Sequence, residues 1–375
     1  MKNITPYAGF ELGPIRPPSE AYSLLLRINR GCGWNKCRFC GFYRDIPFSI
    51  RTADDIKKDI DRIKYWVDVF QGRIAQAGNP QTEGEQEACY MAYNWIQSGM
   101  QSVFFQDANS ILMNPDGMIE VLEYLKATFP QIRRITSYAR SDTINRLSLE
   151  RLTRYRELGL NRFHIGLETG NDYILKLMNK GVDKAAQIRA GIKAKAAGIE
   201  INEFYMPNMG GREYARESAL DTADVMNQVN PDFIRIRSMA LAENLEMYED
   251  YRSGLLTRPN DIETIQEIRL FIENLHGITS VVDSDHILNI LLELRGKLPG
   301  DKDQMLATID RFLDLPEDTQ NIFRLGRRIG VMSHMQDLNN QILVDKVKQT
   351  MDRSGIDKTN IDAVCDQLMI RCIPI

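Results

Sequence analysis

Three cysteines near the start of the chain are the residues best suited to chemistry. Cys32, Cys37 and Cys40 have the spacing C-x4-C-x2-C, and thiolates are ligands that zinc and iron–sulfur clusters prefer. Three thiolates from one short loop can hold three corners of a [4Fe–4S] cluster, which leaves one iron open to another ligand. An open position of this kind is what a metal site needs for chemistry.

Two other metal sites share some of these features. A structural zinc site usually has four ligands, and no nearby Cys or His supplies the fourth. A plant-type [2Fe–2S] site has the same spacing but also needs a fourth cysteine, and the next one, Cys89, lies in a predicted helix. The open [4Fe–4S] cluster leaves fewest observations unexplained, with a non-catalytic iron–sulfur or zinc protein as the rival. We expect Cys89, Cys365 and Cys372 to be ordinary buried cysteines.

Composition and charge narrow the class of protein. The chain has 375 residues with 47 Lys+Arg against 51 Asp+Glu, a net charge of −4, so there is no basic excess of the kind that nucleic-acid binders carry. No apolar run is long enough to span a membrane, and the first residues lack a signal-peptide core. We therefore expect a cytoplasmic protein that does not bind membranes and is not a dedicated nucleic-acid binder.

The cysteines must be positioned by the elements around them, and these alternate between short strands and helices. Such alternation predicts βαβ units with a parallel sheet. Six strands over this length fit a partial (β/α)6 TIM-like barrel, and the cysteine loop then lies at the barrel mouth, where such folds place active sites. The predicted strands are Leu24–Ile28, Ser102–Gln106, Ile132–Tyr138, Arg162–Leu167, Ile199–Met206 and Phe233–Arg237.

The pattern changes at about residue 240. We predict an N-terminal lead-in at residues 1–20, the barrel at 21–240 and a helical C-terminal extension at 241–375. Residues 71–87 are polar and are predicted to form a loop. The helices predicted for the extension are Ile262–His276, His286–Leu294, Lys302–Leu313 and Asn339–Met351.

The chain resembles a known family in its motifs. The cysteine loop after the first strand, Phe39 before the third cysteine, and the segments FHIGLETGND (163–172) and LKLMNKG (175–181) are similar to those of radical S-adenosylmethionine (SAM) enzymes. The branch is the one with oxygen-independent coproporphyrinogen oxidase and the methylthiotransferases. The family's usual spacing is C-x3-C-x2-C, so this chain has one extra residue between its first two cysteines.

The resemblance implies a [4Fe–4S] cluster on Cys32, Cys37 and Cys40 whose open iron binds SAM. One electron, from a donor such as flavodoxin or ferredoxin, would cleave SAM to a 5′-deoxyadenosyl radical, and the cofactors would carry that chemistry. The radical would abstract hydrogen from a small or medium organic substrate, for example a carboxylated one. The runner-up is a radical SAM enzyme that modifies RNA.

The resemblance and strand alternation together suggest contacts with SAM. Phe39 would lie near the adenine. The segment that begins with Gln106 and Asp107 would meet the methionine amino group, through Asp107 or through the local carbonyls. Tyr138 and Arg140 would point inward, and Arg140 could clamp the methionine carboxylate.

Later strands supply the remaining candidates. Glu168 would bind a ribose hydroxyl or the ammonium group, and the backbone of Met206 would approach the adenine. Arg235 and Arg237 would face inward, where buried cations need anions, and one would hold the SAM carboxylate and the other a carboxylated substrate. Candidate catalytic residues at the mouth are Tyr43, Tyr205 and Arg235, whereas His164 is expected to be a hydrogen-bonded core histidine.

Overall fold

The computed structural model describes residues 7–75 and 78–371, and the start of the predicted lead-in and Cys372 lie outside these residues. The chain divides into two compact units, each described here by itself. The first unit comprises residues 1–35, 42–165 and 189–201, and the second comprises 36–41, 166–188 and 202–375.

The first unit is built on parallel strands. β1 (Leu24–Arg27), β4 (Ser102–Gln106), β5 (Arg134–Ala139) and β6 (Leu160–Glu168, up to residue 165 in this unit) are neighbours in that order. In register, Leu25 lies beside Phe104 and Phe104 beside Thr136. Consecutive side chains of these strands, such as Val103 and Phe104, are fully buried, as expected for parallel strands covered on both faces.

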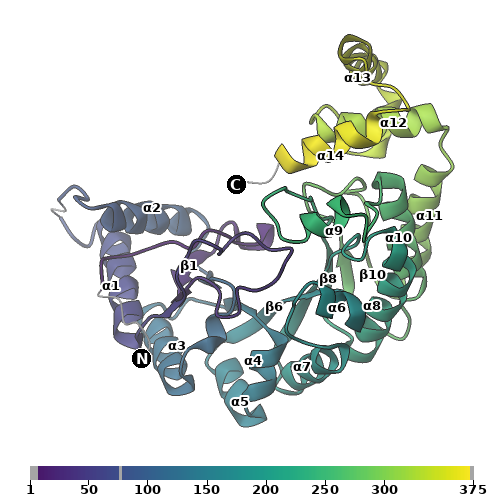
Figure 1. The fold of residues 1–375 in the computed structure, drawn as a ribbon. Coiled ribbons are helices and arrows are strands. Elements are labelled where there is room, and N and C mark those ends of the chain that lie inside the picture. The colour runs from purple at the N-terminus through teal and green to yellow at the C-terminus, as the bar shows by residue number, and fades with distance from the viewer. Residues whose placement is uncertain (1–6, 76–77, 372–375) are drawn as a thin grey trace. The chain divides into compact units, whose positions relative to one another are not determined.

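Helices of the first unit follow the strands in sequence (Figure 1). In α1, Thr52 caps the first turn by accepting the N–H of Asp55, and an apolar stripe that includes Ile56 and Ile60 is buried. The loop predicted for residues 71–87 is shorter, because Thr82 caps a helix that begins at Glu83. These helices are α1 (Ala53–Phe70), α2 (Glu83–Gln97), α3 (Pro115–Thr128), α4 (Ser141–Arg146) and α5 (Leu149–Glu157).

The second unit combines a second group of strands with most of the C-terminal helices. β7 (Glu200–Tyr205), β8 (Phe233–Ile236) and β9 (Val281–Asp283) are parallel, and β10 (Arg295–Lys297) pairs antiparallel with β9. α7 (Lys184–Ala196) is divided between the two units. The other helices are α6 (Asp172–Leu177), α8 (Ala215–Val229), α9 (Tyr248–Arg252), α10 (Asp261–Glu273), α11 (Lys302–Leu313), α12 (Glu317–Arg328), α13 (Gln341–Ser354) and α14 (Ile361–Arg371).

The predicted alternation of parallel strands and helices is confirmed, and all six predicted strands are present. The helix predicted for 286–294 is wrong, because this segment is a loop between β9 and β10, two short strands that the sequence analysis missed. The loop is held by Asn289, whose side chain donates to the carbonyl of Ile236 and to Ser284. The predicted domain boundary at residue 240 stays a prediction.

Candidate active site

The cysteine loop starts from a short antiparallel ladder in the first unit. β2 (Asn29–Arg30) pairs with β3 (Ser49–Ile50), so the two ends of the segment 31–48 are held together. Gly31 follows β2 with φ +71°, and a Cβ there would lie 2.9 Å from the carbonyl oxygen of Ile46. Its N–H donates to Asp107 over 2.7 Å. This position therefore needs a glycine.

The Cys32 part of the loop belongs to the first unit. The backbone N–H of Asn35 donates to Sγ of Cys32 over 3.3 Å, and the Asn35 side chain donates to the carbonyl of Tyr43 over 2.8 Å. Asn35 has φ +45°, a left-handed conformation that asparagine tolerates. Hydrogen bonds to sulfur tune iron–sulfur clusters, so this turn suits a cluster ligand. The Tyr43 side chain is buried.

The Cys37–Cys40 part belongs to the second unit and is held by Arg38. The N–H of Arg38 donates to the carbonyl of Met178 over 3.0 Å, and its own carbonyl accepts the N–H of Met247 over 3.1 Å. Its guanidinium group pairs with Asp250 over 2.8 Å. Cys37 and Cys40 are thus carried by a backbone turn fixed to two other segments of the chain.

The donor set fits an iron–sulfur cluster better than a single metal ion. Cys32, Cys37 and Cys40 are all thiols, and sulfur donors alone disfavour Mg²⁺ and Ca²⁺, which bind oxygen. Within residues 7–75 and 78–371, no group of three His, Cys, Asp or Glu side chains is arranged to hold one metal ion. Three thiols, one of which accepts an N–H···S bond, suit a cluster with one open iron.

Phe39 lies beside an ion pair of the second unit. The Lys180 ammonium is 5.5 Å from the centre of the Phe39 ring and 3.0 Å from Oε1 of Glu168. Glu168 ends β6 with φ +68°, and its carbonyl accepts the N–H of Met206 over 2.8 Å. The carboxylate lies against Gly166, where a Cβ would be 2.2 Å from Oε1. The structure thus brings together three predicted residues, Phe39, Glu168 and Met206, with an unpredicted lysine.

Glu203 of β7 is a buried acid. Burial raises its pKa well above the usual value, nearby Glu168 raises it further, and Lys180 lowers it. Its Oε2 atom is buried and makes no hydrogen bond with the described residues.

Tyr138 belongs to a ring cluster of the first unit. Its ring centre is 5.0 Å from that of Phe104 and 6.0 Å from that of His164. His164 is buried and hydrogen-bonded to Glu20 over 3.2 Å, which confirms the predicted core histidine. Burial alone would raise the pKa of Glu20, but His164, Ser23 and Arg134 hold it below its usual value. Glu20 had no recognisable signal in the sequence.

Three further predicted cofactor contacts have protein partners in the first unit. Gln106 bonds to the backbone of Gly13, accepting its N–H over 2.9 Å. Asp107 accepts from Arg27 over 3.0 Å as well as from Gly31, and burial raises its pKa while Arg27 opposes the shift. Arg140 pairs with Asp142 over 3.0 Å and lies over the Trp34 ring at 5.6 Å. Their contacts with SAM stay predictions.

Two arginines alternate with buried isoleucines at the end of β8. Ile234 and Ile236 are fully buried, whereas Arg235 and Arg237 are only partly buried. Arg235 forms an ion pair with Asp285, and the Arg237 guanidinium stacks 4.1 Å from the centre of the Phe204 ring. These two arginines therefore have different surroundings.

Tyr205 has a structural partner in α10. It is fully buried, its ring centre lies 4.3 Å from that of Phe271, and its hydroxyl donates to Glu267 over 2.8 Å. These contacts place the side chain in the core between β7 and α10. A catalytic role for Tyr205 stays a prediction without a contact that supports it.

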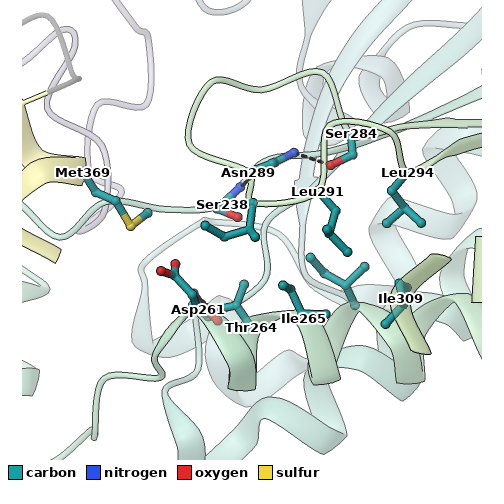
Figure 2. Close-up of a pocket in the computed structure, with 13 residues that line it drawn as sticks. Ser238, Asp261, Thr264, Ile265, Ser284, Asn289, Leu291, Leu294, Ile309 and Met369 are labelled. Carbon is teal, nitrogen blue, oxygen red and sulfur yellow. Dashed lines mark hydrogen bonds between the residues drawn. The ribbon is translucent and has the colours of Figure 1, made fainter. Parts of the chain in front are cut away.

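An enclosed cavity in the second unit is too small for a substrate. Figure 2 shows it between α10 and the loop that carries Ser284 and Asn289, with Leu291 and Ile265 among its lining residues. Its volume of about 10 Å³ is the space of one water molecule.

The cysteines outside the loop differ in their exposure to solvent. Cys365 is buried as predicted, whereas Cys89 is only partly buried. In the described part of the chain, no helix is both long and apolar enough to cross a membrane.

Comparison with solved structures finds several radical SAM proteins of low identity. Elp3 from the archaeon Methanocaldococcus infernus is 16% identical over 52% of this chain and 51% of that one, with a TM-score of 0.41. Methylornithine synthase is 16% identical over 71% of this chain and 66% of that one, with a TM-score of 0.42. Coproporphyrinogen III oxidase from Escherichia coli is 17% identical over 67% of this chain and 52% of that one, with a TM-score of 0.45.

The chain thus spans between half and two thirds of the length of these proteins. A search of the curated proteins found no match. The family model described as the radical SAM superfamily matches residues 26–225, which is more than half of the chain and includes all three cysteines of the loop. The chain therefore belongs to the radical SAM superfamily, whose members use a [4Fe–4S] cluster and S-adenosylmethionine.

Proposed function

We propose that this chain is a radical SAM enzyme that removes a hydrogen atom from a small or medium organic substrate. Cys32, Cys37 and Cys40 would hold the [4Fe–4S] cluster. When bound, the cluster and SAM supply the reductive cleavage that yields the 5′-deoxyadenosyl radical. The observation that carries the proposal is the three-thiol loop inside the segment that matches the family model.

The chain's own residues would position the cofactors. Gly31 and Asp107 fix the start of the cysteine loop, and Arg38 fixes its second part. We therefore propose that Asp107 positions the loop.

The group around Phe39 is the best candidate for contacts with SAM. Phe39 offers a ring for the adenine, and Glu168 offers a carboxylate for a ribose hydroxyl or the ammonium group. Lys180 balances the charge of Glu168 at 3.0 Å. Tyr138, Arg140 and the backbone of Met206 are further proposed contacts.

The cluster assignment is tested by comparing two cysteine variants. After anaerobic reconstitution with iron and sulfide, the wild type should bind about four irons per chain and form 5′-deoxyadenosine from SAM under dithionite. Cys37→Ala should lose the cluster and this product, whereas the control Cys89→Ala should keep both. A Cys37→Ala protein with a full cluster would refute the assignment, and a four-iron wild type that forms no 5′-deoxyadenosine would refute the function.

The electron donor has its own test. We propose a one-electron protein such as flavodoxin or ferredoxin. Replacing dithionite by reduced flavodoxin should sustain 5′-deoxyadenosine formation in the wild type, and failure with both flavodoxin and ferredoxin would contradict the proposal.

A further inference from the structure

The end of β8 and the segment after β9 bring several charged side chains of the second unit together. Arg235 lies beside Asp283 in the strand register and forms an ion pair with Asp285. Asp283 also pairs with Arg295 over 3.3 Å. The positive charge of Arg235 is therefore balanced by carboxylates of the protein.

Arg237 is in a different situation. Its Nε and Nη2 atoms are buried, and no acceptor among the described residues takes their hydrogens. Its guanidinium stacks on Phe204, which attracts the cation but offers its N–H groups no acceptor in the ring plane. Two buried guanidinium donors without an acceptor are unfavourable unless an anion meets them.

Two neighbours of Arg237 also have unused polar atoms. Oδ1 of Asp285 and Nδ1 of His286 are buried without a hydrogen-bond partner in the described chain. His286 has its pKa lowered to about 4, mainly by burial, with Arg237 and Arg328 adding to the shift and Asp285 opposing it. The imidazole is thus neutral at neutral pH and lies within the electrostatic reach of both Arg237 and Asp285.

The segment that carries Asp285 and His286 is fixed by several hydrogen bonds. The missing partners of Asp285 Oδ1 and His286 Nδ1 are therefore not explained by a loosely held loop. The N–H of Ser284 donates to the carbonyl of Leu294 over 3.1 Å, and Asn289 bonds to Ser284 over 2.8 Å (Figure 2). From α12, Arg327 donates to the carbonyl of Asn289 over 2.8 Å. Arg328 likewise donates to the carbonyl of Leu288 over 2.6 Å.

We propose that Arg237, Asp285 and His286 recognise a substrate carboxylate that has a hydrogen-bond donor on the adjacent carbon, as in α-hydroxy and α-amino acids. The Nε and Nη2 edge of Arg237 binds the carboxylate in a two-pronged fashion. Oδ1 of Asp285 accepts from the hydroxyl or ammonium group, and Nδ1 of His286 supplies the remaining hydrogen bond. The inference rests on the proposed function, because it names the substrate class of that reaction.

SAM also has a carboxylate beside an amino group, so it is the competing occupant. In the second unit, Lys180 lies over the Phe39 ring of the cysteine loop and pairs in turn with Glu168. The described contacts of Arg237 are with Phe204, at its ring, and with Tyr205, whose carbonyl accepts the Arg237 N–H. We assign Arg237 to the substrate, and the SAM affinity of Arg237→Gln tests that assignment.

Small acids without a side chain test the recognition directly, because nothing in them can clash. Glycolate, glycine, acetate and methylamine are titrated against the cluster-loaded enzyme, and binding is followed by thermal unfolding and by NMR line broadening. Glycolate and glycine should bind about tenfold or more tightly than acetate, and methylamine should not bind. Arg237→Gln should weaken glycolate binding about tenfold or more, whereas the exposed control Arg295→Gln should bind it like the wild type.

Each other result overturns part of the proposal. Glycolate binding that is absent, or equal in the wild type and Arg237→Gln, refutes the site. A loss of SAM affinity of about tenfold in Arg237→Gln identifies SAM as the ligand and refutes the substrate assignment. If the wild type binds glycolate through Arg237 but forms no 5′-deoxyadenosine, the proposed function fails while the carboxylate site stands.

Discussion

Glu267 shows how one buried carboxyl group makes the stability of the fold depend on pH. It lies fully buried on α10, and it accepts the Tyr205 hydroxyl over 2.8 Å and the N–H of Asn208 over 2.9 Å. Burial raises its pKa from 4.5 to about 7, even though the hydrogen bonds lower it. The folded protein therefore holds a proton that the unfolded chain releases at lower pH.

The expected result is a loss of stability as pH rises. The contribution of a raised carboxyl pKa is fully present below about pH 4.5 and is lost as the pH passes through about 7. Between pH 5 and 8 the loss is on the order of 3 kcal/mol. Glu267→Gln cannot titrate, so its free energy of unfolding should change less over this range, as measured by urea denaturation at several pH values. If the free energy of unfolding changed with pH equally in the two proteins, Glu267 would not titrate in this pH range.

Some residues of the site could be predicted from the sequence, and others could not. The cysteine triad and the core position of His164 follow from spacing and alternation, because both are local properties of the chain. The Lys180–Glu168 pair and the Tyr205–Glu267 bond join residues that are far apart in sequence or on different elements. Such partners depend on tertiary packing, which no local pattern contains.

The cysteine loop is the element whose positioning matters most for the proposed chemistry. Its first residue, Gly31, is tied to β4 through the carboxylate of Asp107, and Asp107 in turn receives Arg27 from β1. Arg27 also pairs with Glu11 over 3.1 Å. One buried side chain therefore links two strands to the start of the loop.

Loss of this link should weaken cluster binding. Asp107→Ala removes the acceptor of the Gly31 N–H, at a cost of about 1–3 kcal/mol, and should lower both the iron content and the thermal stability. Asp107→Asn keeps an acceptor and should fall between the alanine variant and the wild type. The control is Asp61→Ala, which removes only an exposed hydrogen bond to Tyr124. Full iron content in Asp107→Ala would mean that the loop is fixed by its other contacts.

The predicted helices and strands are right where the local sequence signals agree. They are wrong where contacts with a distant part of the chain decide the conformation. Two residues after the ends of α5 and α7, Gly159 and Gly198 have positive φ, and the same position after α6 is taken by Asn179. Residues 286–294 are rich in Ile and Leu, which resembles a helix face, but Arg327 and Arg328 of α12 hold the segment as a loop. β9 and β10 were missed because each has only three residues.

On the scale of the second unit, a buried charge network links three helices of the C-terminal part. Asp261 at the start of α10 pairs with Arg324 over 3.2 Å and with Arg328, both from α12. Arg324 also pairs with Asp362 of α14. Burial alone would raise the pKa of Asp261, but the two arginines hold it below its usual value. Figure 1 shows α12, α13 and α14 together in this part of the chain.

Removing the acid at the centre of this network should therefore be costly. Asp261→Ala leaves two buried guanidinium groups without their main partner, which should lower the free energy of unfolding by about 3–5 kcal/mol. Asp310→Ala is the matched control, because Asp310 pairs with Arg269 at the surface and its removal should cost at most about 1 kcal/mol. Urea denaturation of both variants measures the difference, and hydrogen exchange should show the loss of protection in α12 and α14. Equal costs for the two variants would mean that the buried network adds no more stability than an exposed pair, so that apolar packing alone holds the three helices together.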